Sequence, residues 1–182
     1  VVAGHLIGII HGCFYFYGSG VFFPRLLTHV GSGAAAMGGA IGLSRLEAGL
    51  IAPVSGWLID RYGPRWVLFP GLGIMGLGFI ALSYISQLWM VYAVFLVLAF
   101  GASLGGSRPV TVAVANWFVR KRSRAMGFIF AGFGAGGSLV FILGWLIEGL
   151  GWQTSAVIAG VTFWILGFPL ALIVRHRPQQ MG

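Results

Sequence analysis

Six long apolar runs constrain this chain more than any other feature of its sequence. Each run is close to the ~20 residues that an α-helix needs to cross a hydrocarbon core of about 30 Å. Apolar residues surround each run on all sides instead of following one stripe, which is the pattern of helices in lipid. The runs predict an all-α membrane protein with six transmembrane helices, at residues 1–24, 34–59, 66–85, 88–118, 125–147 and 154–174.

Composition supports lipid as the main solvent of this chain. Hydrophobic residues make up 58% of it and charged residues 8%, with a mean hydropathy of +0.95. A net charge of +8 is compatible with nucleic acid as a partner, but the basic residues lie at the edges of apolar runs and form no stripe with aromatics. The single Cys13 has no partner for a disulfide or a metal site. We therefore expect a lipid bilayer as partner, no nucleic acid, no cofactor and no metal.

The positions of the basic residues predict the orientation in the membrane. Eight of the eleven follow the second, fourth and sixth runs, namely Arg61, Arg65, Arg120, Lys121, Arg122, Arg124, Arg175 and Arg177. Positive residues favour the cytoplasmic side. Both termini are therefore predicted to lie in the cytoplasm, with the protein in the plasma or inner membrane.

An internal repeat appears when the chain is compared with itself at an offset of 88 residues. Residues 56–60 and Gly63 then fall on residues 144–148 and Gly151, and residues 18–19 fall on residues 106–107. Three crossings separate the copies, so the two halves have opposite orientations, as in the inverted repeats of secondary transporters. The sequence predicts one bundle at 1–174 with triplets at 1–85 and 88–174, and the start of a cytoplasmic linker at 175–182.

Small residues predict where the helices pack closely. The spacing Gly-x-x-x-Gly lets helix backbones approach each other, and it occurs within the runs at Gly8 and Gly12, Gly38 and Gly42, Gly101 and Gly105, and Gly132 and Gly136, among others.

The segment at 56–65 carries the sharpest motif, Gly-Trp-Leu-Ile-Asp-Arg-Tyr-Gly-Pro-Arg. It ends a helix, turns at Gly-Pro and places an acid between two guanidinium groups. It resembles the loop signature Gly-x-Leu-x-Asp-Arg-x-Gly-x-Arg of the major facilitator superfamily. The resemblance implies a conformational latch formed by Gly56, Asp60, Arg61, Gly63 and Arg65. The alternative is an ordinary basic cytoplasmic loop.

A second resemblance covers the fourth and fifth runs. Asn116-Trp117-Phe118, the basic residues 120–122 and the glycines at 127, 132, 136 and 137 are similar to the monocarboxylate and oxalate/formate branch of that superfamily. The resemblance implies the N-terminal half of a secondary transporter, a symporter by analogy, whose first, second, fourth and fifth helices line the path. Relatives usually have twelve helices. We therefore expect a fragment whose partner is the missing C-terminal six-helix half or a second copy.

Charged and polar residues inside the runs are the candidate solute-binding residues. Arg108 lies near the bilayer middle, where a guanidinium needs a wet cavity or a partner, and we expect it to bind a small anionic carboxylate. Arg45 is a second candidate cation, and His11 and Tyr15 lie one turn apart in the first helix. Glu47 and His11 are possible proton sites. Each residue also has a structural alternative, such as pairing with a backbone carbonyl or another helix.

Two other functions are alternatives to transport, and one further motif match is rejected. Gly-Ala-Ser-Leu-Gly at 101–105 has the nucleophile-elbow pattern of a serine hydrolase, so an intramembrane enzyme acting through Ser103 is an alternative. A non-transporting membrane scaffold is another. The dinucleotide pattern at 71–76 is rejected because no strand precedes it. The favoured prediction is a transporter with no catalytic residues.

Overall fold

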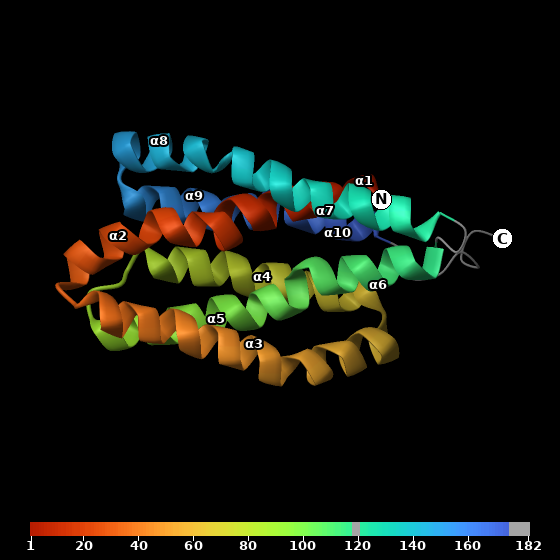
Figure 1. Ribbon diagram of the computed structural model, residues 1–182, viewed down its shortest axis with the longest axis horizontal. Helices are drawn as coiled ribbons and strands as arrows, with labels where there is room; N and C mark the ends of the chain where they lie inside the picture. Colours follow the sequence, from red (N-terminus) through yellow and green to blue (C-terminus); the bar gives the residue numbers. More distant parts are fainter. Residues whose placement is uncertain (118–120, 175–182) are drawn as a thin grey trace.

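Six helical rods make up the computed structural model, which describes residues 1–117 and 121–174 without the side chains of Met37 and Asn116. The predicted linker at 175–182, and Phe118 and Arg120 of the second resemblance, lie outside these residues. The rods run side by side along the long axis (Figure 1). Their elements are α1 (Val2–Ile10), η1 (His11–Tyr17) and α2 (Gly18–Val30) in rod 1; α3 (Ala34–Tyr62) in rod 2; α4 (Pro64–Leu82) in rod 3; α5 (Leu88–Gly105) and α6 (Ser107–Trp117) in rod 4; α7 (Arg122–Ser138) and α8 (Val140–Leu150) in rod 5; and α9 (Trp152–Ile165) and α10 (Gly167–Ile173) in rod 6.

The rods confirm the predicted all-α membrane fold. Five of them are long and apolar enough to cross a bilayer: Val2–Val30, Pro64–Leu82, Leu88–Ala115, Arg122–Leu150 and Trp152–Ile173. The remaining rod, α3, is 29 residues long but carries Arg45 and Glu47 in its middle, which lowers its hydropathy. That α3 also crosses the membrane stays a prediction.

Several helix ends differ from the predicted runs. Rod 1 continues six residues past the predicted end at Pro24, to Val30. Membrane helices tolerate an internal proline because neighbouring groups satisfy the freed carbonyl. Rod 5 begins at Arg122, before the predicted start at residue 125. A basic residue at a helix end is compatible with the polar edge of a bilayer.

Two turns share one geometry at the positions that the repeat relates. Gly63 has φ 88° and ψ 155°, and its N–H donates to the Ile59 carbonyl; Gly151 has φ 84° and ψ 158°, and its N–H donates to the Ile147 carbonyl. Only glycine adopts this backbone conformation readily. The α3–α4 turn lies at the end of the bundle that carries the N-terminus, and the α8–α9 turn lies at the opposite end (Figure 1). The repeat is therefore inverted in space.

Two irregularities in the helices also lie at positions that the repeat relates. The π-helical segment η1 gives way to α2 at Gly18, and Gly106 separates α5 from α6 with φ −94° and ψ −145°. These glycines are 88 residues apart in the sequence. Near mid-length, rod 1 is therefore π-helical and rod 4 is interrupted, and π-helical segments often mark functional sites.

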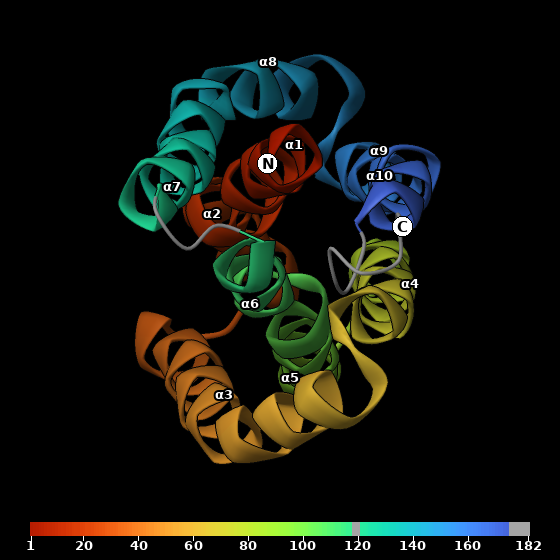
Figure 2. The same cartoon turned by 90° about the vertical axis from the view of Figure 1, so that its right-hand side faces the viewer.

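The order of neighbouring rods shows that the two triplets are interleaved. Rod 2 packs on rod 4, rod 4 on rod 3, rod 3 on rod 6, rod 6 on rod 1 and rod 1 on rod 5 (Figure 2). Exchanging rods 1, 2 and 3 with rods 4, 5 and 6 reproduces the same order in reverse. Each triplet thus inserts its first rod into the other, and residues 1–85 and 88–174 do not form separate bodies.

Glycine contacts decide which rods approach most closely. A Cβ on Gly105 would lie 2.6 Å from the Gly71 carbonyl carbon, and one on Gly12 would lie 2.8 Å from the Phe133 carbonyl oxygen. Rod 4 therefore packs backbone to backbone on rod 3, and rod 1 on rod 5. Gly38 and Gly42 of α3 meet nothing within 4 Å. The prediction of close packing at that pair is wrong for the described part of the chain.

Candidate functional site

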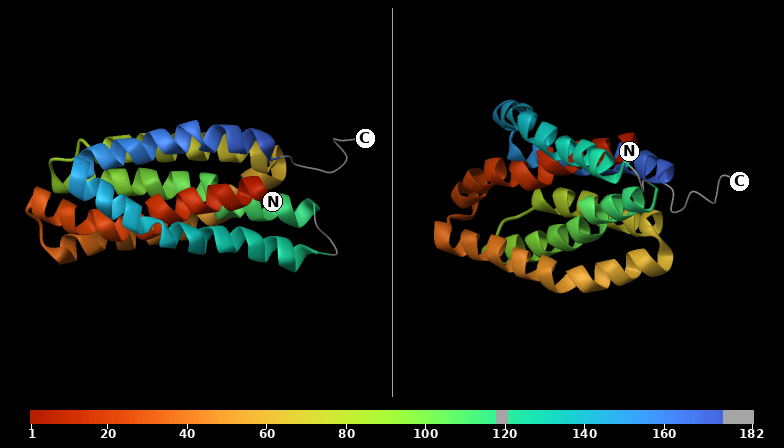
Figure 3. Two further views of the ribbon diagram at one scale, coloured as in Figure 1. Left: turned by 90° about the horizontal axis from the view of Figure 1, so that it is seen from above. Right: turned by 45° about the vertical axis from the view of Figure 1, so that its right-hand side comes forward.

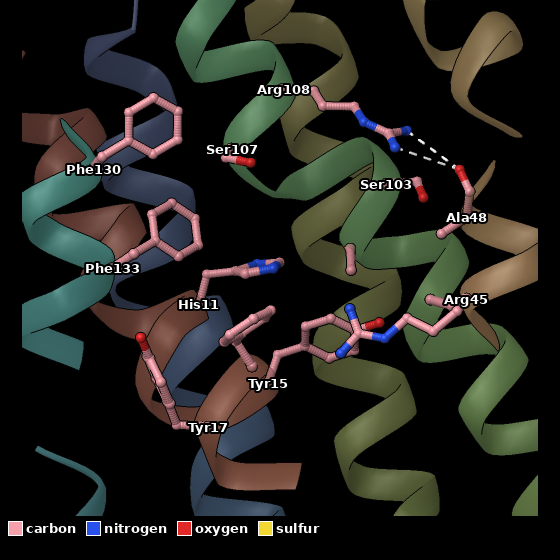
Figure 4. Close-up of a pocket in the computed structure, with 13 residues that line it drawn as sticks. His11, Tyr15, Tyr17, Arg45, Ala48, Ser103, Ser107, Arg108, Phe130 and Phe133 are labelled. Atoms are coloured by element: carbon pink, nitrogen blue, oxygen red, sulfur yellow. Dashed lines mark hydrogen bonds between the residues drawn. The ribbon is translucent and has the colours of Figure 1, made fainter. Parts of the chain in front are cut away.

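A pocket of about 340 Å³ opens at mid-length between α3 and α7. Its walls come from η1, α3, the α5–α6 junction and α7, which belong to rods 1, 2, 4 and 5 (Figure 4). Aromatic side chains supply most of the wall: Tyr15, Phe16, Tyr17, Phe130 and Phe133. The predicted solute-binding residues His11, Tyr15, Arg45 and Arg108 all line it, so the fold brings together residues from rods 1, 2 and 4.

Arg108 reaches across the pocket from α6 to α3. Its guanidinium donates to the Ala48 carbonyl oxygen over 3.4 and 3.5 Å, and to the Ser55 hydroxyl over 3.5 Å. These distances exceed the usual 2.7–3.2 Å of N–H···O bonds, and a guanidinium has five N–H donors. Arg108 is exposed. The group is therefore held in place without being saturated, and it keeps donors for an anion.

A second hollow adjoins the pocket on the other side of Arg108. It has a volume of about 400 Å³ and shares Ser107, Arg108 and Phe130 with the first. Its further lining residues include Ser55 and Gly56 of α3. The two hollows together form a groove along α3, with Arg108 between them.

Arg45 is the second cation of the pocket. Its guanidinium carbon lies 5.5 Å from the centre of the Phe16 ring, a cation–π distance. The side chain is exposed. Among the described residues it forms no ion pair with Glu47. The two residues are two positions apart on one helix, which points their side chains in nearly opposite directions.

His11 and Tyr15 face the pocket from η1. The two rings are 5.0 Å apart, and the His11 ring also meets Phe133 at 5.6 Å. His11 is only 6% exposed and its Nδ1 has no hydrogen-bond partner in the described structure. A Cβ on Gly106 would lie 2.9 Å from His11 Cε1. The break in rod 4 therefore leaves the room that the imidazole occupies.

Glu47, the other predicted proton site, does not line the pocket. It is half-buried on α3, and its Oε2 has no hydrogen-bond partner among the described residues. Its role as a proton site stays a prediction.

The predicted latch lies at the end of the bundle where the N-terminus lies and α3 turns into α4 (Figure 1). Gly63 makes the turn, and Pro64 opens α4, where the missing N–H of proline is harmless. Asp60 forms no ion pair with Arg61 or Arg65 within the described chain, and the role of these residues as a latch stays a prediction. The guanidinium carbon of Arg61 lies 5.2 Å from the centre of the Trp57 ring. Asp60 and Arg61 are exposed.

The basic loop residues gather at that same end. Seen from two further directions, the N-terminus, the α3–α4 turn, the start of α7 and the end of α10 lie together (Figure 3). Arg61, Arg65, Lys121, Arg122 and Arg124 belong to these segments, and we call this end of the molecule the basic end.

The sequence alone does not identify Ser103 and Ser107 as candidate solute contacts. Ser103 and Ser107 line the pocket on either side of the Gly106 break. Sequence reasoning had considered Ser103 only as a possible nucleophile. His11 lines the same pocket, but no hydrogen bond joins it to Ser103 and no carboxylate pairs with it in the described chain. A nucleophile, base and acid are therefore not assembled.

Apolar rods around a cationic, aromatic pocket define the class of this protein, an integral multi-pass membrane protein with a solute-sized site. The family profile of the Major Facilitator Superfamily matches residues 6–182. The chain belongs to this superfamily.

Curated relatives support the predicted branch. The chain is 30% identical to the oxalate:formate antiporter of Oxalobacter formigenes over 156 residues, which cover 84% of this chain and 36% of the relative. It is 30% identical to human monocarboxylate transporter 2 over 151 residues, covering 77% of this chain and 30% of the relative. It is 28% identical to the 3-(3-hydroxy-phenyl)propionate transporter of Escherichia coli over 166 residues, covering 84% of this chain and 40% of the relative. The chain spans about a third of the length of these relatives.

Proposed function

We propose that this chain is half of a secondary active transporter that moves a small carboxylate anion by alternating access. The observation that supports this most is Arg108, whose long hydrogen bonds to Ala48 and Ser55 leave donors facing a pocket of about 340 Å³. Charge-assisted bonds from a guanidinium to a carboxylate are short and can be bidentate. The names of two relatives, for oxalate and formate and for monocarboxylates, agree with such a cargo.

The other pocket residues have supporting roles in this proposal. Arg45 contributes a second positive charge, and His11 and Tyr15 contact the solute from rod 1. Glu47 or His11 carries the coupled proton of a symport cycle. The open side between α3 and α7 faces a second six-helix bundle, either the C-terminal half of the same protein or a second copy, and rocking of the two bundles exposes the pocket to each side in turn.

The basic end is the cytoplasmic end in this proposal, because positive loops remain on that side. Asp60, Arg61 and Arg65, together with Gly56 and Gly63, form the latch that stabilises one closed state there. Asp60 and Arg61 are exposed and form no ion pair with the described residues, so they are available to the second bundle. Asp60→Asn is expected to reduce uptake while membrane insertion stays normal, because the latch shifts the population of the two states. Unchanged uptake would remove the latch from the proposal.

Flux through the whole transporter in proteoliposomes tests the role of Arg108. Labelled oxalate, formate and acetate are the probes. We expect Arg108→Gln to lower uptake at least tenfold, because a lost charge-assisted bond is worth about 1.5–3 kcal/mol. Arg108→Lys is expected to be intermediate, since an ammonium keeps the charge without the planar fork.

Arg25→Gln is the matched control, because Arg25 is a cation near the end of the bundle opposite the basic end and does not line the pocket. Its uptake should equal that of the wild type. Equal uptake by Arg108→Gln and wild type would contradict the binding role. Absence of flux with every probe, together with capture of a protein partner, would favour the membrane scaffold.

A further inference from the structure

Two polar side chains in the pocket are buried and lack partners within the protein. His11 and Ser103 are each 6% exposed. Nδ1 of His11 has no hydrogen-bond partner, and the Ser103 hydroxyl forms no hydrogen bond with the described residues. They come from different rods, η1 of rod 1 and α5 of rod 4, and both line the same pocket. Buried polar groups are normally hydrogen-bonded, so the pair needs an explanation.

The hydroxyls of Ser103 and Ser107 differ from most other serine and threonine hydroxyls in the described bundle. Serine and threonine in helices usually donate to a carbonyl three or four residues earlier. Eight hydroxyls do so here, on Ser19, Thr28, Ser44, Ser55, Ser83, Thr111, Ser155 and Thr162. The hydroxyls of Ser103 and Ser107 make no such bond within the described chain. Both remain free to donate to a bound molecule.

The break at Gly106 explains why His11, Ser103 and Ser107 line one pocket. Ser103 precedes the break and Ser107 follows it, while the absent side chain of Gly106 admits the His11 ring from rod 1. Figure 4 shows His11 and Ser107 on one side of the pocket and Ser103 on the other, next to Ala48, with Arg108 above them and Arg45 below. The cluster thus adjoins the Arg108 guanidinium but contains no cation of its own.

We infer that Ser103, Ser107 and His11 form a neutral polar subsite that binds a second oxygen of the cargo, beside the Arg108 subsite for its carboxylate. This inference rests on the proposed function. Hydroxyls donate and accept, and an imidazole has two ring nitrogens for hydrogen bonding. Such a set suits an alcohol, ketone or ether oxygen. The cargo is therefore a carboxylate with a neutral oxygen substituent, and the aromatic walls pack against its carbon skeleton.

Binding to the purified protein tests this directly. The probes are butyrate and its 2-, 3- and 4-hydroxy derivatives, which differ only in the second oxygen. Dissociation constants come from the ligand-dependent rise in the unfolding temperature. We expect at least one hydroxybutyrate to bind about 2- to 10-fold more tightly than butyrate, the range that one neutral hydrogen bond gives.

Two variants separate the subsites. Ser103→Ala should bring the ratio of the butyrate dissociation constant to that of the hydroxy derivative close to one. The affinity of this variant for butyrate should stay within about twofold of the wild-type affinity. Arg108→Gln should weaken all four ligands together. Ser44→Ala is the matched control, because Ser44 is also 6% exposed but its hydroxyl donates to the Ala40 carbonyl outside the pocket. It should keep the wild-type preference.

The outcomes distinguish this inference from the proposed function. Equal affinity of the wild type for all four ligands overturns the neutral subsite while leaving the Arg108 site intact. Equal weakening of butyrate and hydroxybutyrate by Ser103→Ala also overturns it. If no ligand binds, or if Arg108→Gln changes nothing, the proposed function fails and the inference fails with it.

Discussion

At the scale of single residues, two histidines of rod 1 have opposite environments. Nδ1 of His5 lies 2.6 Å from the Phe128 carbonyl oxygen, and the two rings stack at 4.3 Å. His11 is more deeply buried, yet its Nδ1 has no partner in the described structure. His5 therefore links rod 1 to rod 5 by a hydrogen bond and a stacked ring, whereas His11 keeps an unpaired ring nitrogen at the pocket. Polar groups held against their desolvation cost are characteristic of functional sites in membrane proteins.

This contrast predicts opposite effects of the same substitution. His11→Leu should leave the unfolding temperature unchanged or raise it, because a buried group without a partner costs about 1–3 kcal/mol. The preference for hydroxybutyrate over butyrate should be lost. His5→Leu should lower the unfolding temperature, since it removes a hydrogen bond and a stacked ring. Thermal unfolding in detergent measures both, and a clear loss of stability in His11→Leu would contradict this account.

At the scale of elements, the two glycine turns are equivalent parts of the inverted repeat. Gly63 and Gly151 each end one helix and precede the next, with φ of 88° and 84°. A Cβ in this backbone region strains the chain whatever space surrounds it. The repeat therefore has a conformational basis as well as a sequence basis.

Replacement of either turn glycine is expected to have the same cost. Gly63→Ala and Gly151→Ala should each destabilise the protein by about 1–3 kcal/mol, the range for a residue held in a sparsely populated backbone conformation. Gly144→Ala is the control, because a Cβ there meets nothing within 4 Å and Gly144 lies inside α8. Its stability should not fall. Tolerance of alanine at 151 but not at 63 would show that the turns are not equivalent.

At the scale of the whole molecule, the described termini and the basic end lie together (Figure 1). Both ends of a six-crossing bundle lie on one side, and positive loops select the cytoplasm. A cysteine or glycosylation tag before Val1 and one after Gly182 should therefore report the same compartment, the cytoplasm. Reporters placed at Gly33, before α3, and at Gln153, in the first turn of α9, lie at the other end and should be accessible from outside.

The same labelling tests whether α3 crosses the membrane. If α3 does not cross, the two termini lie in opposite compartments, since five crossings reverse the chain. Opposite reports from the two tags would remove the six-helix topology and with it the inverted repeat across the membrane. A Cys13→Ser background keeps the native thiol out of the measurement.

Sequence periodicity and composition determined the six rods, the basic end and the register of the repeat, because these follow from local hydropathy and spacing. Arg45, Arg108, His11 and Tyr15, which line one pocket, were recognisable as candidate site residues because polar groups in apolar runs are costly. Ser103 and Ser107 were not recognisable as a binding pair, since a helical serine usually satisfies its own hydroxyl. Only the tertiary structure decided that rods 1 and 4 interleave the triplets, that a Cβ on Gly38 or Gly42 would meet nothing within 4 Å in the described chain, and that His11 and the two serines line one pocket. These features depend on which helix faces pack together, and that is fixed by contacts between residues far apart along the chain.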